Sequence, residues 1–209
     1  MATSSVWLAT LRRPMQRSKG ASAVPPDLTA IQNLVYQPLG LASSAPQAEA
    51  ESADYGAFSF VLDGAHIRFR VAKTTPTKVG QFVTLWKRQG KGPIAPFDQS
   101  DAVDCFVVST RSPDHFGHFV FPTAVLCAQG VVSVNGVGGK RAIRVYPPWD
   151  NTTSRQAAAT QRWQADYFLD VTLGRAVDTT RARQLYFQTR ESVYNLGQES
   201  PTAKTLSAQ

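Results

Sequence analysis

Residues 58–72 have the sequence Phe-Ser-Phe-Val-Leu-Asp-Gly-Ala-His-Ile-Arg-Phe-Arg-Val-Ala, and this stretch determines the architecture that the sequence predicts. An apolar run leads into Asp63-Gly64, a dipeptide typical of a tight turn between antiparallel strands. Beyond the turn, apolar side chains alternate with Arg68 and Arg70. Because successive side chains of a strand point to opposite faces, both arginines are expected on one face of a β-hairpin.

Further strands and helices are predicted on both sides of this hairpin. Alternating or continuous apolar runs indicate strands, and Asp27, Pro122 and Ser154 stand where helices typically begin. The run at 104–109 is nearly continuous in apolar residues, which is typical of a central strand. We predict strands over 79–86, 104–109, 117–121 and 141–146, and helices from 27 to about 38, from 122 to 130, from 154 to 163 and from 180 to 194. Residues 164–172 fit a continued helix or a strand.

This order of elements predicts an α/β protein with one domain, in which a central mixed sheet is flanked by helices. The length of 209 residues and the apolar fraction of 43% suffice for one core. We expect a tail over residues 1–26, the domain over 27–172, and a C-terminal helix with a polar tail over 173–209.

The composition indicates a basic protein outside the membrane. There are 22 Lys and Arg residues against 15 Asp and Glu residues, a net charge of +7. Such a surface attracts anions, nucleic acid among them, although many basic proteins bind none. No apolar run approaches the roughly 20 residues of a membrane helix. The two cysteines lie in apolar runs without metal-ligand spacing, which fits a reducing, cytoplasmic location.

Residues 1–26 leave two interpretations of location open. They contain four basic residues and no acid, a composition that organelle transit peptides share. A basic tail without a targeting role has the same composition, and we prefer it. The four basic residues are Arg12, Arg13, Arg17 and Lys19.

The segment from Arg68 to Lys91 is the most prominent candidate for a binding surface, because it holds seven basic residues and no acid. Basic side chains on one strand face favour contacts with nucleic-acid phosphates. The alternatives are a solvated sheet face, or a module that binds a small anionic ligand or a protein partner. Phe82 is expected in the core, and the place of Trp86 is left open. The expected nucleic-acid-binding residues are Arg68, Arg70, Lys73, Lys78, Lys87, Arg88, Lys140 and Arg141.

Several long strings resemble the MepB family over roughly residues 27–170. They lie at 55–60 (Tyr-Gly-Ala-Phe-Ser-Phe), 69–88 (from Phe-Arg-Val-Ala-Lys to Thr-Leu-Trp-Lys-Arg), 119–122 (Phe-Val-Phe-Pro), 139–149 (Gly-Lys-Arg-Ala-Ile-Arg-Val-Tyr-Pro-Pro-Trp) and 160–164 (Thr-Gln-Arg-Trp-Gln). The resemblance implies the fold of that family and no particular activity.

A weaker resemblance, to nucleases of the PD-(D/E)XK type, implies a restriction-endonuclease-like topology. Such enzymes hold Mg²⁺ with carboxylates, and a lysine stabilises the developing charge. Lys73 matches the motif lysine, but Val71 stands where the paired acid is expected. Glu51 and Asp63 are the candidate carboxylates, so this resemblance implies a metal-dependent phosphodiesterase with a degenerate site, or a nuclease-like fold without cleavage.

Overall fold

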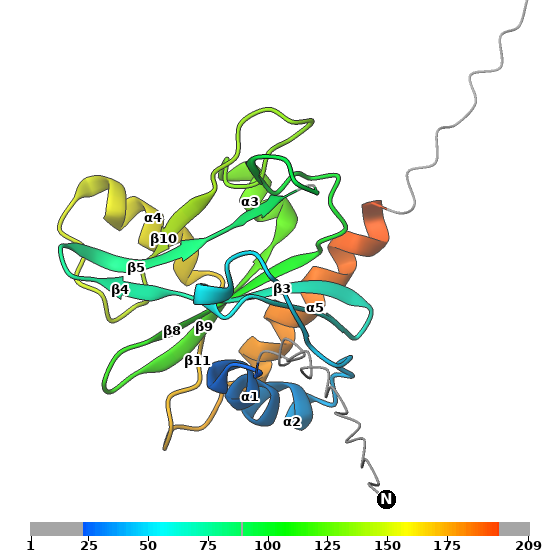
Figure 1. The fold of residues 1–209 in the computed structure, drawn as a ribbon. Coiled ribbons are helices and arrows are strands. Elements are labelled where there is room, and N and C mark those ends of the chain that lie inside the picture. Colours follow the sequence, from blue (N-terminus) through cyan, green and yellow to red (C-terminus); the bar gives the residue numbers. More distant parts are fainter. Residues whose placement is uncertain (1–22, 89, 197–209) are drawn as a thin grey trace, which may run out of the picture.

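A six-stranded mixed sheet forms the centre of the protein (Figure 1). The computed structural model describes residues 23–88 and 90–196. The strand order is β1-β2-β3-β8-β9-β11; β3 and β8 run parallel, and the other neighbours are antiparallel. The strands are β1 (Gln47–Ala48), β2 (Phe58–Leu62), β3 (Ala65–Val71), β8 (Cys105–Arg111), β9 (Phe116–Pro122) and β11 (Phe168–Asp170). The predicted hairpin is confirmed as β2–β3, and the predicted central strand as β8.

Two smaller sheets lie over one face of the large sheet, together with two α-helices and one short 3₁₀ helix. The order in the three-stranded sheet is β10-β5-β4, with antiparallel pairing throughout, and β6 pairs with β7. The elements of this layer are η2 (Ala53–Tyr55), β4 (Lys73–Thr75), β5 (Lys78–Thr84), β6 (Trp86–Arg88), β7 (Ile94–Pro96), α3 (Thr123–Ala128), β10 (Ala142–Val145) and α4 (Arg155–Ala165). The strands predicted at 79–86 and 141–146 therefore correspond mainly to β5 and β10 of the three-stranded sheet.

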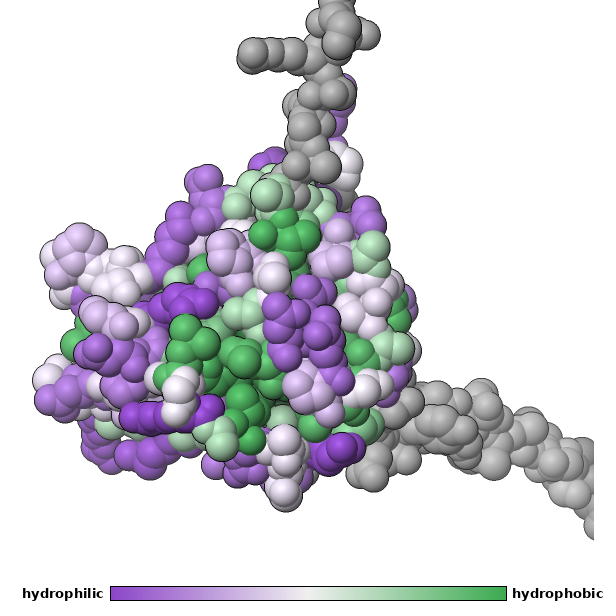
Figure 2. All heavy atoms as spheres, turned by 90° about the horizontal axis from the view of Figure 1, so that it is seen from below, coloured by the Kyte–Doolittle hydropathy of each residue, from purple (hydrophilic) through white to green (hydrophobic). Residues whose placement is uncertain are grey.

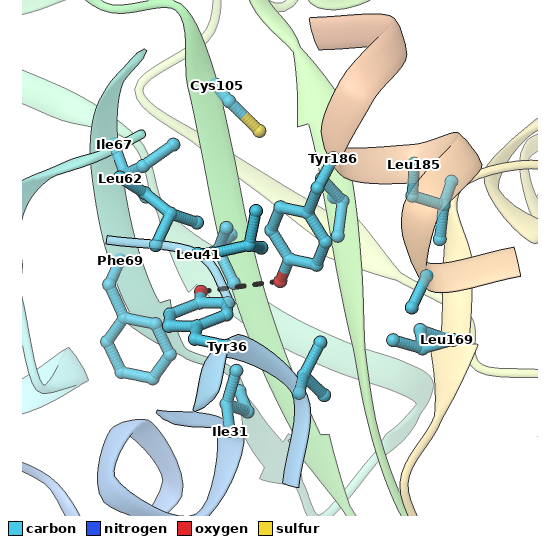
Figure 3. Close-up of a cluster of buried hydrophobic side chains, with 14 of the residues drawn as sticks. Ile31, Tyr36, Leu41, Leu62, Ile67, Phe69, Cys105, Leu169, Leu185 and Tyr186 are labelled. Atoms are coloured by element: carbon cyan, nitrogen blue, oxygen red, sulfur yellow. Dashed lines mark hydrogen bonds between the residues drawn. The ribbon is translucent and has the colours of Figure 1, made fainter. Parts of the chain in front are cut away.

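Helices cover the other face of the large sheet. The predicted first helix begins with α1 (Pro26–Ile31), continues as the π-helical turn η1 (Gln32–Tyr36) and ends with α2 (Gln37–Leu39). The last helix, α5 (Thr179–Leu196), packs beside it, and Figure 3 shows Tyr36 and Tyr186 facing each other. Segments from opposite ends of the described chain thus share one apolar core.

Strand β8 explains how one sheet separates two cores. Its side chains alternate: Cys105 and Val107 pack in the core under the helices, whereas Phe106 and Val108 pack in the core under the small sheet. Because both faces are covered, the first four residues of the strand, Cys105–Val108, are all apolar. The predicted α/β domain with a central mixed sheet flanked by helices is confirmed.

None of the helices in residues 23–88 and 90–196 is long and apolar enough to cross a bilayer. Seen from below (Figure 2), apolar side chains gather in the middle of one face and hydrophilic ones surround them. The predicted tail and targeting role of residues 1–22 lie outside the described residues, as does the polar tail from 197 onward.

Candidate nucleic-acid interface

Arg68 and Arg70 lie on one face of β3, as their spacing predicts, but that face is covered by the smaller sheets. The side chain of Arg70 has no exposed surface, and its Nη2 lies 2.5 Å from a carboxylate oxygen of Glu49. The other oxygen of Glu49 pairs with Arg68. Burial lowers the pKa of Arg70, while Glu49 opposes that shift. The expectation that Arg70 contacts nucleic acid is wrong for this structure, because the side chain does not reach the surface.

Two further basic residues of the segment are also paired with acids. Lys87 forms an ion pair with Asp101, and Arg88 forms one with Glu51 at 2.9 Å. Both acids, Asp101 and Glu51, lie outside the segment in sequence and contact it in the fold. The segment from Arg68 to Lys91 is therefore less positive at its surface than the sequence indicates, since four of its basic side chains have carboxylate partners.

The two candidate catalytic carboxylates are not gathered around Lys73 as a pair. Asp63 occupies the β2–β3 turn with a φ of 53°, whereas Lys73 follows the opposite end of β3. A seven-residue strand separates them, a span on the order of 20 Å. Glu51 is the partner of Arg88. Among the residues that the structure describes, no group of three or more His, Cys, Asp or Glu side chains could hold a metal ion.

A row of aromatic and basic side chains lies on the three-stranded sheet, on the face that points away from the large sheet. On β5, Gln81 and Val83 are buried toward the large sheet, so Phe82 points outward. Phe82 is the register partner of Lys73 on β4 and of Arg144 on β10. Cross-strand partners stand side by side on one face of a sheet, so a cation lies on each side of the ring.

Two tyrosines extend this row. The ring of Tyr55 lies 6.1 Å from that of Phe82, and Nζ of Lys73 lies 4.9 Å from the Tyr55 ring. At the other end, a Cβ on Gly80 would lie 2.5 Å from the Tyr146 ring, so only glycine lets the tyrosine approach so closely. We call the surface formed by Tyr55, Lys73, Phe82, Thr84, Arg144 and Tyr146 the outer face. Phe82, expected in the core, is half-buried on this face instead.

Arg144 is held in place without being neutralised. Its Nη1 donates to the carbonyl of Gly80 at 2.9 Å, and its Nη2 donates to the hydroxyl of Thr75 at 2.8 Å. Its guanidinium lies 5.9 Å from the Phe82 ring. Within residues 23–88 and 90–196 it has no carboxylate partner, and a guanidinium carries five N–H donors. Arg144 therefore keeps its charge and spare donors for an anion.

The chain around β10 and α4 concentrates positive charge near the outer face. Residues 115–165 contain five basic residues and the single acid Asp150. Burial raises the pKa of Asp150. Lys140 and Arg141, two of the expected binding residues, are exposed just before β10, and Lys73 and Lys78 are exposed on β4 and β5. The five basic residues are Lys140, Arg141, Arg144, Arg155 and Arg162.

Arg144 is the basic residue of the outer face that the sequence-based set lacks, and the aromatic residues of this face are missing from that set as well. The sequence shows the basic character of Arg144, but only the strand pairing places it beside Phe82 and Lys73. The signal available from sequence is the spacing of three between Arg141 and Arg144, which predicts that the two point to opposite faces of a strand. That spacing does not say which face is open.

The comparisons with known proteins agree on the fold. A family model described as MepB-like matches residues 49–170. A solved structure described as "Crystal Structure of MepB" is similar to this chain, with 32% sequence identity and a TM-score of 0.60 over 62% of this chain and 87% of that chain. No curated protein matches the chain. These matches confirm the resemblance that the sequence strings indicate, and the nuclease-like topology stays a prediction.

Proposed function

The chain belongs to the MepB-like family, and we propose that it binds single-stranded nucleic acid on the outer face. The observation that carries this proposal is the row in which Phe82 stands between Lys73 and Arg144, with a tyrosine at each end. Aromatic rings on an open sheet stack with unpaired bases, whereas the bases of a duplex are already stacked on each other.

The charges around the row suit a phosphate backbone. Lys73, Lys78 and Arg144 lie on the three-stranded sheet or its turn, and none of them has a carboxylate partner among the described residues. Cations at intervals beside aromatic rings bind phosphates while the bases stack, which gives affinity without sequence preference. Arg68, Arg70, Lys87 and Arg88, which the sequence favoured, support the surface through their ion pairs instead.

Cleavage is outside this proposal. Asp63 lies at the opposite end of β3 from Lys73, and Glu51 is paired with Arg88, so Lys73 is assigned to phosphate binding.

The proposal is tested with fluorescence anisotropy on labelled single-stranded DNA and RNA oligonucleotides at low salt. We expect Lys73→Glu to weaken binding by about tenfold, because it removes one phosphate contact and adds repulsion. The matched control is Arg183→Glu, an exposed residue of α5 behind the opposite face of the large sheet. It changes the net charge equally and should leave the affinity nearly unchanged. Equal losses in both variants, or no binding by the wild type, would overturn the proposal.

A further inference from the structure

A pocket beside the outer face extends the proposed function, and we infer that it holds one nucleotide at the end of the bound strand. The pocket lies between α4 and the free edge of β10, which are neighbours in Figure 1. Its volume is about 350 Å³, at the lower end of the range for small-molecule sites. This inference rests on the proposed function, since the strand that enters the pocket is the one on the outer face.

A buried glutamine holds the pocket walls together. Gln164 of α4 is only 1% exposed, and its amide nitrogen donates to the carbonyl of Arg144 at 3.0 Å. Its amide oxygen accepts from the backbone N–H of Tyr146 at 2.8 Å. These two hydrogen bonds fix helix α4 along the edge strand β10, where another strand could otherwise pair. The pocket is the space left beside them.

The lining of the pocket has the chemistry that a nucleotide needs. Tyr146 and Trp163 provide flat aromatic surface for a base. The Thr160 hydroxyl donates to the carbonyl of Gln156 at 3.0 Å, so its oxygen is left to accept from the edge of the base. The charged lining residues are both basic, Lys140 and Arg144, and both suit a phosphate. No acid lines the pocket.

Two residues belong to the pocket and to the outer face at once. Arg144 and Tyr146 point outward from β10 and also line the pocket. A strand that stacks on the outer face therefore leads directly to the pocket mouth. Because the volume suits one nucleotide and not a base pair, the substrate class is a single strand with an unpaired terminal nucleotide.

The pocket is tested with adenosine 5′-monophosphate and adenosine as probes, followed by isothermal titration calorimetry. We expect the monophosphate to bind with saturation and at least about tenfold more tightly than adenosine, because the two cations contact the phosphate. Ala157→Phe fills the pocket and should abolish binding of both probes, whereas Ala159→Phe, on the exposed side of the same helix, should leave it unchanged. Lys140→Gln should weaken binding of the monophosphate and leave binding of adenosine unchanged.

The outcomes separate this inference from the proposed function. If oligonucleotides bind but neither probe does, or if Ala157→Phe binds the monophosphate like the wild type, the pocket inference is overturned and the proposed function stands. If the monophosphate binds and oligonucleotides do not, the proposed function is overturned and the pocket is supported as a mononucleotide site. Should Ala157→Phe fail to fold, as judged by circular dichroism, equal effects of Lys140→Gln on both probes would overturn the assignment of the phosphate.

Discussion

At the scale of single residues, Glu49 is the carboxylate that compensates the buried positive charge of Arg70. One carboxylate serves two arginines, of which Arg70 is wholly buried and Arg68 is about one third exposed. Removing one partner of a buried pair leaves an uncompensated charge, which is far more destabilising than the loss of a surface pair. The two smaller sheets pack over these residues, so the charge cluster also supports the layer that carries the outer face.

We therefore expect Glu49→Gln to lower the free energy of unfolding by roughly 3 kcal/mol. Urea unfolding at neutral pH measures it. The matched control is Glu51→Gln, the same change two residues later, in an ion pair with Arg88 whose side chains are 36% and 37% exposed. That pair should contribute about 1 kcal/mol or less. Similar losses in the two variants would contradict the assigned role of Glu49.

A buried histidine predicts the pH dependence of stability. His118 is enclosed in the core, and burial lowers its pKa to about 3. An unfolded chain binds that proton near pH 6.5. Between these two values the proton binds only to the unfolded state, so stability is lost as the pH falls below about 6.5, by up to about 1.4 kcal/mol per pH unit.

Urea unfolding between pH 7 and pH 5 tests this expectation. His118→Gln should make the decline shallower, because the titrating imidazole is gone. His66→Gln, at an exposed position of β3, should keep the wild-type slope. An unchanged slope in His118→Gln would show that other groups cause the decline.

At the scale of elements, the start of the first helix shows what local sequence can and cannot predict. Apolar spacing predicts the helix over 27–38, and α1 begins at Pro26. Asp27 was expected to cap it, but the N-cap residue is Pro25, and the Asp27 carboxylate instead accepts from Ser109 and Arg111 of β8. Spacing along the chain predicts an element, whereas the partner of a polar side chain depends on which strand folds beside it.

The same distinction applies to α5. The sequence predicts this helix well, but it does not predict which residues the helix contacts. Its residues Ala182, Leu185 and Tyr186 belong to the core under the helices. The Tyr186 hydroxyl lies 2.8 Å from Nε2 of His118 and 3.3 Å from the hydroxyl of Tyr36, the latter contact dashed in Figure 3. A helix beyond the family match at 49–170 is thus bonded to the central sheet.

We expect Tyr186→Phe to destabilise the protein by about 1–3 kcal/mol, because the buried His118 and Tyr36 side chains then lose a hydrogen-bond partner. Thermal unfolding followed by circular dichroism measures the change. Thr180→Val, which alters a side chain in the exposed first turn of the same helix, is the control and should have little effect. If the two variants melt alike, the hydroxyl contacts do not hold α5 in place.

At the scale of the whole molecule, the layers decide which charges are open. The alternation on β3 correctly predicts one face for Arg68 and Arg70, but hydrophobic patterning does not say that the three-stranded sheet covers it. Strands β4 and β5 follow β3 in the chain, while β10, which completes their sheet, comes from far along the sequence. The outer face depends on that distant pairing, so its aromatic and basic row was not predictable from any one segment.

This division of charges gives a whole-molecule prediction for salt dependence. Neutralising phosphates of a single strand releases counterions, so the logarithm of the binding constant falls with the logarithm of salt concentration with a slope near −0.7 per phosphate. If Lys73, Lys78, Lys140 and Arg144 each bind one phosphate, the slope should be about −3.

Lys78→Gln should reduce the magnitude of this slope by about 0.7. Lys91→Gln changes an exposed lysine of the paired segment outside the outer face, and should leave the slope unchanged. Anisotropy titrations over a salt series measure all three proteins. A slope that responds to Lys91→Gln and not to Lys78→Gln would contradict the outer face as the binding surface.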